Sequence, residues 1–124
     1  MVVEITELLS GYFVLSLYLY HMKYLITESQ FDKVIFKYLD NQDFIKSEED
    51  GFIYFINSEG DEYNQIRFYE GDGVCTINSL LVREISKFFS LSNGHSIDVI
   101  GKWVEHTLQM EVSRIFTAIL YRED

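Results

Sequence analysis

The clearest hydrophobic pattern in the chain lies between residues 27 and 41. Thr27 and Gln30 have the spacing of a capping box, in which two side chains bond each other's backbone N–H at the start of a helix. Apolar residues then recur at the spacing of one helix face, at Phe31, Val34, Ile35, Tyr38 and Leu39. The pattern predicts a helix that ends at Asp40-Asn41.

The preceding segment, Val2 to Leu25, fits two patterns. Between Leu15 and Tyr20 leucines alternate with Ser and Tyr, as in a strand. A helical spacing also runs through the segment, at Leu8, Tyr12, Leu15, Leu19 and Met22. Because the segment is long and rich in leucine, we expect a helix and keep a strand as the alternative. Its uncharged run is shorter than the ~20 residues of a membrane span and follows acids rather than bases, so we expect a buried element.

Residues 44–78 have the composition of β-strands. Three runs are dense in aromatic and β-branched residues: 52–56, 63–69 and 74–77. Gly71-Asp72-Gly73 is the strongest turn signal, since Asp-Gly readily adopts the positive φ angles of a hairpin turn. We expect a three-stranded antiparallel meander, with Phe44-Ile45 as a candidate extra strand at its edge.

From residue 78 onward the pattern is helical again. Asn78 or Ser79 is expected to cap a helix with apolar positions at Leu81, Ile85, Phe88 and Phe89. Ser96 is expected to cap a second helix after the break at residues 92–94, with Trp103 beside a stripe at Ile97, Ile100, Val104 and Leu108. Residues 112–121 either continue this helix or form a final strand.

These elements predict an α+β fold. A small antiparallel meander of three strands, or four with the candidate edge strand, would be covered on one face by N- and C-terminal helices. The 124 residues suffice for one sizeable core, and the 48% apolar content is ordinary for a globular protein. Since no linker or repeat interrupts the pattern, we expect residues 1–124 to form a single compact domain.

The negative charge of the chain is concentrated in its middle. The formal net charge is -10, and residues 40–72 alone hold ten acids against two bases. The segments before and after this stretch are nearly neutral. Such a local field attracts cationic partners and repels nucleic acid and anionic membrane surfaces. We therefore expect no direct binding to nucleic acid or membrane.

Most of these acids fall on predicted turns of the meander. The three clusters are Glu48-Glu49-Asp50, Glu59 with Asp61 and Glu62, and Glu70 with Asp72. Because alternate turns of a meander lie at opposite ends of the sheet, the first and third clusters should share an end. Acids on turns often serve solubility alone. The functional alternative is a docking surface for a basic protein; a divalent-cation site has less support, because residues 59–62 are too few for an EF-hand loop.

A second candidate site is the outward face of the sheet. Since side chains alternate along a strand, Arg67 and Tyr69 should share one face. Tyr54 could join them, although its apolar neighbours leave its direction open. An Arg flanked by tyrosines suits a protein or ligand contact. The alternative is a half-exposed sheet on which Arg67 neutralises neighbouring acids.

No motif for catalysis, metal binding or a cofactor stands out. None of the histidines (His21, His95 and His106) has a Cys or another His within four residues, as zinc sites usually need. The adjacency of His95, Ser96 and Asp98 in the sequence does not provide the geometry of a catalytic triad. No Gly-rich loop leads into a helix to bind phosphate. We expect no catalytic residues, no metal and no cofactor.

Cys75 is the only cysteine, which excludes an intramolecular disulfide. A lone thiol fits a reducing compartment and most often behaves as a small buried apolar residue. We therefore expect a cytoplasmic protein with a structural Cys75.

Two main functions fit this sequence. The first is a non-enzymatic protein-binding module, such as an acidic inhibitor or immunity-type factor that docks on a basic, nucleic-acid-binding protein. The second is a structural or self-assembling module, because an interface between identical copies would bury some of the ten Phe and nine Tyr. A small-ligand-binding domain is a further alternative, which a deep cavity lined by Tyr, Arg67 and a histidine would favour.

Overall fold

The structure, a computed structural model, describes residues 3–4, 25–26, 28–57 and 63–121. The chain folds as two compact units, residues 1–39 and residues 40–124. The single compact domain expected from the sequence stays a prediction.

The first unit contains a short strand pair and most of a helix. Strands β1 (Val3–Glu4) and β2 (Leu25–Ile26) pair in antiparallel orientation. The described ends of the segment expected to be helical are thus strands, and the remainder of that segment lies outside the described residues.

Helix α1 (Glu28–Asp40) confirms the predicted helix and its end at Asp40. Four of its five predicted apolar positions are buried, and Val34 is half-buried. Thr27, the expected cap, lies outside the described residues. Among the described helices, none has the length and apolar content to cross a bilayer.

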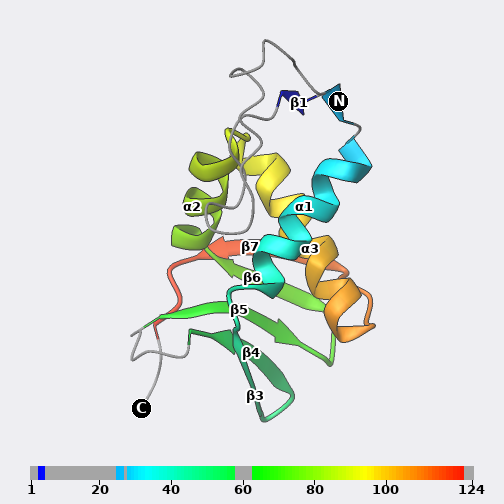
Figure 1. The fold of residues 1–124 in the computed structure, drawn as a ribbon. Helices are drawn as coiled ribbons and strands as arrows, with labels where there is room; N and C mark the ends of the chain where they lie inside the picture. The colour runs from blue at the N-terminus through cyan, green and yellow to red at the C-terminus, as the bar shows by residue number, and fades with distance from the viewer. Residues whose placement is uncertain (1–2, 5–24, 27, 58–62, 122–124) are drawn as a thin grey trace. The chain divides into compact units, whose positions relative to one another are not determined.

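The second unit is built on a five-stranded sheet. Its strands are β3 (Ile45–Glu49), β4 (Phe52–Ile56), β5 (Asn64–Tyr69), β6 (Val74–Asn78) and β7 (Arg114–Ala118). They lie side by side in this order (Figure 1). The first four form the antiparallel meander that the sequence predicts, with β3 as its fourth strand.

Strand β7 makes the sheet mixed rather than purely antiparallel. It pairs with β6 in parallel orientation, from Val74 opposite Arg114 to Asn78 opposite Ala118. A parallel neighbour requires a long crossover, and two helices between β6 and β7 supply it. Of the two alternatives for residues 112–121, the strand is correct, because the chain leaves the helical conformation at Gln109 with φ 55°.

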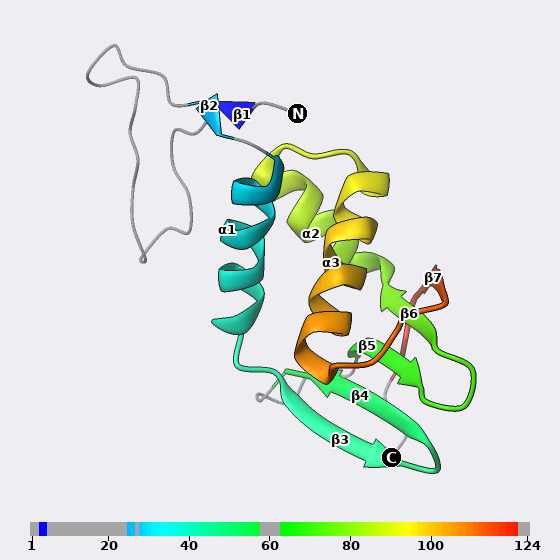
Figure 2. The same ribbon diagram turned by 90° about the vertical axis from the view of Figure 1, so that its right-hand side faces the viewer.

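The crossover helices α2 (Ser79–Phe89) and α3 (Asn93–Leu108) cover one face of this sheet (Figures 1 and 2). Helix α2 buries Leu81, Ile85 and Phe89 as predicted. Phe88, which was also expected on this face, is 40% exposed. With 3.6 residues per turn, adjacent side chains on a helix point about 100° apart, so Phe88 and Phe89 cannot both face the sheet fully.

The start of α3 differs from the sequence prediction. Its N-cap is Ser92, whose hydroxyl accepts a bond from the backbone N–H of His95 (3.1 Å), so the prediction of Ser96 as the cap is wrong. Ser96 lies within the first turns, fully buried, with its hydroxyl 2.7 Å from that of Ser86 on α2. A small hydroxyl pair here allows the two helices to approach closely. Besides Ser96, α3 buries Val99, Ile100, Gly101, Trp103 and Val104, with Ile97 and Leu108 half-buried.

The core of the second unit lies between these helices and the sheet. The sheet contributes Ile53, Phe55, Ile66, Phe68, Cys75 and Ile77, each at most 3% exposed. They alternate along β4, β5 and β6 with residues that point to the other face. We call that other face, turned away from α2 and α3, the open face.

A tight turn fixes the register of the β3–β4 hairpin. Asp50 and Gly51 form a two-residue connection, with φ angles of 51° and 83°. Positive φ at both central residues is the geometry of a type I′ turn, whose twist matches that of the flanking strands. Asp-Gly is the favoured sequence for this turn. The turn expected at residues 71–73 is confirmed too: it joins the antiparallel strands β5 and β6, with Gly73 at φ 74°.

Candidate functional site

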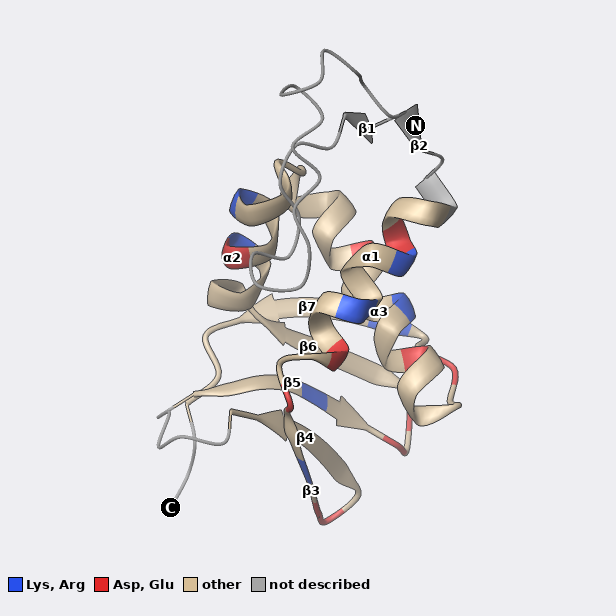
Figure 3. Cartoon of the chain, viewed as in Figure 1, with Lys and Arg blue, Asp and Glu red and all other residues tan. Residues whose placement is uncertain are grey.

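Two of the predicted acidic clusters meet at one end of the sheet. The backbone N–H of Glu70 donates to the carbonyl of Gly51 at 3.0 Å, which ties the β5–β6 turn to the β3–β4 turn. Glu48, Glu49 and Asp50 on the first turn, and Glu70 and Asp72 on the second, are all exposed. The red turn tips in Figure 3 mark this shared end.

The loop between α3 and β7 brings a further acid to the same end. The backbone N–H of Ser113 donates to the carbonyl of Gly73 at 2.9 Å, which holds this loop against the β5–β6 turn. The exposed Glu111 lies in this loop, two residues before Ser113. We call Glu48, Glu49, Asp50, Glu70, Asp72 and Glu111 together the acidic end.

The acidic end is hollowed on the side of the β5–β6 turn. An open concavity of about 390 Å³ is lined by Glu70, Asp72 and Glu111, with Met110 beside them. Met110 is 39% exposed. Carboxylates next to an exposed thioether can receive a Lys or Arg side chain, since its apolar stem packs on the methionine while its charged head meets the acids.

One acid of this end also has a structural role. The Asp72 side chain accepts a bond from the backbone N–H of Val74 at 3.0 Å and so closes the turn that leads into β6. Its backbone carbonyl accepts from the Ser113 hydroxyl. Asp72 therefore shapes the acidic end as well as contributing charge to it.

The remaining predicted cluster is not placed. Glu59, Asp61 and Glu62 lie outside the described residues. Lys46 is a base beside the acidic cluster on β3, and its Nζ lies 4.0 Å from the Glu48 carboxylate with both side chains more than half exposed.

The open face gathers the predicted Arg–Tyr group. Tyr54 and Arg67 are direct cross-strand partners on β4 and β5, and Tyr69 follows two residues after Arg67. The structure thus places Tyr54 on the same face as Arg67, a point that the sequence left open. Phe52, not named from the sequence, completes the group because it pairs with Tyr69 and its ring lies 4.7 Å from the Tyr69 ring.

Arg67 makes an aromatic contact rather than a salt bridge within this group. Its guanidinium carbon lies 5.7 Å from the centre of the Phe52 ring. Among the described residues, no carboxylate forms an ion pair with it. Neutralisation of neighbouring acids by Arg67, the alternative interpretation, therefore has no described partner to support it.

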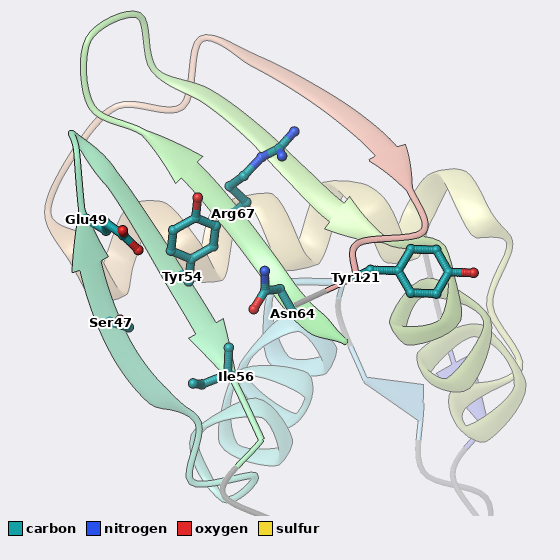
Figure 4. A pocket seen from close by; sticks show the side chains of 7 residues that line it. All are labelled: Ser47, Glu49, Tyr54, Ile56, Asn64, Arg67 and Tyr121. Carbon is teal, nitrogen blue, oxygen red and sulfur yellow. The ribbon is translucent and has the colours of Figure 1, made fainter. Parts of the chain in front are cut away.

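A shallow concavity on the open face lies beside this group. It measures about 180 Å³ and is lined from three strands and the C-terminal segment by Ser47, Glu49, Tyr54, Ile56, Asn64, Arg67 and Tyr121 (Figure 4). Small-molecule sites usually enclose about 300–1,000 Å³. This concavity is smaller, and its described lining contains no histidine.

The residues considered for catalysis do not assemble into a reactive group. Ser96 is fully buried against Ser86, whereas Asp98 is exposed on α3. Cys75 is fully buried on β6, and burial raises the pKa of its thiol to about 12. A thiol with such a pKa is protonated and unreactive at neutral pH, in agreement with the structural role expected. Among the described residues, no three His, Cys, Asp or Glu side chains are placed to hold a metal ion.

The sequence reasoning missed Phe52, Met110 and Glu111. Phe52 belongs to a continuous apolar run in which both alternating faces are hydrophobic, so only the register distinguishes them. Met110 and Glu111 reach the acidic end through the parallel pairing of β7, and that pairing has no local signal in the sequence. A search with family models, curated proteins and solved structures finds no match to this chain.

Proposed function

We propose that this chain is a non-enzymatic protein-binding module that docks a cationic protein at its acidic end. The observation that carries the proposal is the bond between Glu70 and Gly51, because it joins two acidic turns into one surface. Carboxylates held in fixed positions can occupy the places that phosphates take against Lys and Arg. An inhibitor or immunity-type factor for a nucleic-acid-binding protein would act in this way, and complementary charge would speed its encounter.

The neighbouring open face supports the same proposal. Tyr69 and Phe52 lie next to the turns that carry the acids, and Tyr69 is 37% exposed. Aromatic residues and Arg supply much of the binding energy at protein interfaces, whereas charges at the rim chiefly set the rate of encounter. The acidic end would steer a basic partner, and the Arg67 group would then pack against it.

Paired charge variants test this proposal. Glu49→Lys with Glu70→Lys reverses two exposed acids of the acidic end and leaves the turn-closing Asp72 intact. Glu84→Lys with Asp98→Lys makes the same change in net charge on exposed positions of α2 and α3. Both variants and the unmodified protein are immobilised and used to capture proteins, which mass spectrometry identifies.

If the proposal is correct, mass spectrometry should identify basic proteins that bind the unmodified chain and the Glu84→Lys/Asp98→Lys variant. The same proteins should not bind the Glu49→Lys/Glu70→Lys variant, which we call the acidic-end variant. A purified protein from that set should then bind more weakly as salt is raised. Equal capture by all three chains, with circular dichroism showing the fold intact, would refute docking at the acidic end.

A further inference from the structure

The outer edge of the sheet is strand β3, and none of its residues lines the concavity of the acidic end. β3 is the first strand in the sheet order, and among the described strands only β4 pairs with it. All five of its residues are exposed. Edge strands are commonly protected by proline, a bulge, very short length or charged side chains, especially Lys. β3 has no proline or bulge, since its five residues pair with β4 without interruption. Its protection is charge, at Lys46, Glu48 and Glu49, and that protection fails against a partner strand that places opposite charges across from Lys46 and Glu48.

The hydrogen-bonding pattern shows which backbone groups face outward. Gly51 bonds to Glu70 on the β5 side, so by alternation the backbone groups of Phe52, Tyr54 and Ile56 face β3. Their partners are Glu49, Ser47 and Ile45. A two-residue hairpin independently requires that the residues flanking the turn bond to each other. The backbone N–H and C=O groups of Lys46 and Glu48 therefore point away from the sheet.

These two residues make the edge complementary to itself. When two antiparallel copies meet about a two-fold axis at Ser47, Lys46 of each copy lies directly opposite Glu48 of the other. Opposite charges at directly paired positions stabilise an antiparallel pair, and like charges destabilise it. Registers centred on Lys46 or on Glu48 would instead oppose identical charges. Within one chain the two side chains lie on the same face, 4.0 Å apart and exposed, so both are available to a second copy.

We propose that β3 pairs with β3 of a second copy of this chain in that register, which joins two five-stranded sheets into one. The partner strand is β3 of a second copy, because Lys46 of each copy then lies opposite Glu48 of the other. Each copy carries a formal charge of -10, which opposes association, so the dimer should be seen at moderate rather than low ionic strength. This pairing does not rest on the docking of a basic protein, although it uses Glu48, which also belongs to the acidic end. The concavity lined by Glu70, Asp72 and Glu111 contains no residue of β3.

A charge exchange tests the register. Lys46→Glu places Glu opposite Glu, and Glu48→Lys places Lys opposite Lys, so each variant alone should dimerise about tenfold more weakly or worse, given two like-charged pairs per dimer. An equimolar mixture of the two variants restores both opposite-charge pairs. Sedimentation should therefore show a dimer for the unmodified chain and for the mixture, and monomers for each variant alone. A monomeric unmodified chain, or identical behaviour of all four samples, would overturn the proposal.

A cysteine at the two-fold axis gives a second, structural test. Ser47 would face Ser47 of the second copy as a non-hydrogen-bonded pair, in which Cα atoms are about 4.5 Å apart, within the range of a disulfide. Ser47→Cys should therefore form a covalent dimer under mild oxidation, while the buried Cys75 does not react. Glu49→Cys is the matched control, because its counterpart would be Ile45. Equal cross-linking of the two variants, or none for Ser47→Cys, would contradict the register.

Discussion

Asn78 shows how one residue joins the sheet to its covering helices. Its side-chain oxygen accepts from the backbone N–H of Leu80 at 2.9 Å, and its amide nitrogen donates to the carbonyl of Asn64 at 2.8 Å. The residue is fully buried at the point where β6 becomes α2. The Asn side chain carries an acceptor oxygen and a separate donor nitrogen, so it can cap the helix and donate to a neighbouring strand at the same time.

Asn78→Ala should therefore lower the free energy of unfolding by more than the removal of an ordinary N-cap does. We expect a decrease of about 2–3 kcal/mol in the free energy of unfolding, because a cap is lost and the Asn64 carbonyl loses a partner. Ser92→Ala removes the exposed cap of α3 and should cost about 1 kcal/mol. Urea denaturation of both variants measures the difference, and equal costs would show that the second bond contributes nothing.

The buried thiol of Cys75 gives stability a dependence on pH. Its pKa is raised from 9.0 to about 12 in the folded protein, so above pH 9 the unfolded chain loses this proton first. The contribution of the neutral thiol to the free energy of unfolding is fully present below pH 9 and decreases as the pH rises toward 12. The unmodified chain and the Cys75→Ala variant should differ in free energy of unfolding, and this difference should shrink by about 1.4 kcal/mol per pH unit between pH 9 and 12. A difference in unfolding free energy that stays constant from pH 8 to 11 would contradict this burial effect.

At the scale of elements, local signals predicted most of the second unit. The apolar spacing that identified α2, and the runs that identified β4, β5 and β6, are properties of neighbouring residues. The start of α3 was misplaced because Ser92 and Ser96 are both acceptable caps, and only packing against Ser86 assigns Ser96 to the interior. Strand β7 could not be distinguished from a helix, because its partner β6 is distant in the sequence.

The type I′ turn at Asp50-Gly51 permits a test at this scale. Gly51 has φ 83°, and an added Cβ would lie 3.3 Å from the Tyr69 ring, so Gly51→Ala should lower the free energy of unfolding by about 1–2 kcal/mol. Gly94 in the first turn of α3 has no atoms within 4 Å of such a Cβ, and Gly94→Ala should raise stability by about 0.5–1 kcal/mol. Thermal or urea denaturation of the two variants measures both changes. A Gly51→Ala variant as stable as the unmodified chain would contradict the turn assignment, and a loss of stability in Gly94→Ala would contradict the open surroundings of Gly94 in α3.

At the scale of the whole molecule, much of the negative charge in residues 40–72 lies at one end of the sheet, the acidic end. Alternation of turns in a meander was enough to predict that the clusters at residues 48–50 and 70–72 share an end. The sequence could not show that Glu111 joins them, because this depends on the loop that precedes β7. Nor could it show that the Arg67 group lies on the open face next to that end, since this required the register of β4.

The central claim, that the acidic end receives a cationic protein, is tested most directly by association kinetics with a captured basic partner. Association rates of the Glu49→Lys/Glu70→Lys and Glu84→Lys/Asp98→Lys variants are compared at low and moderate salt, since both have the same net charge. We predict a rate at least about tenfold lower for the acidic-end variant at low salt, with the gap closing as salt is raised. Equal rates for the two variants would contradict the claim, because net charge alone would then account for the attraction.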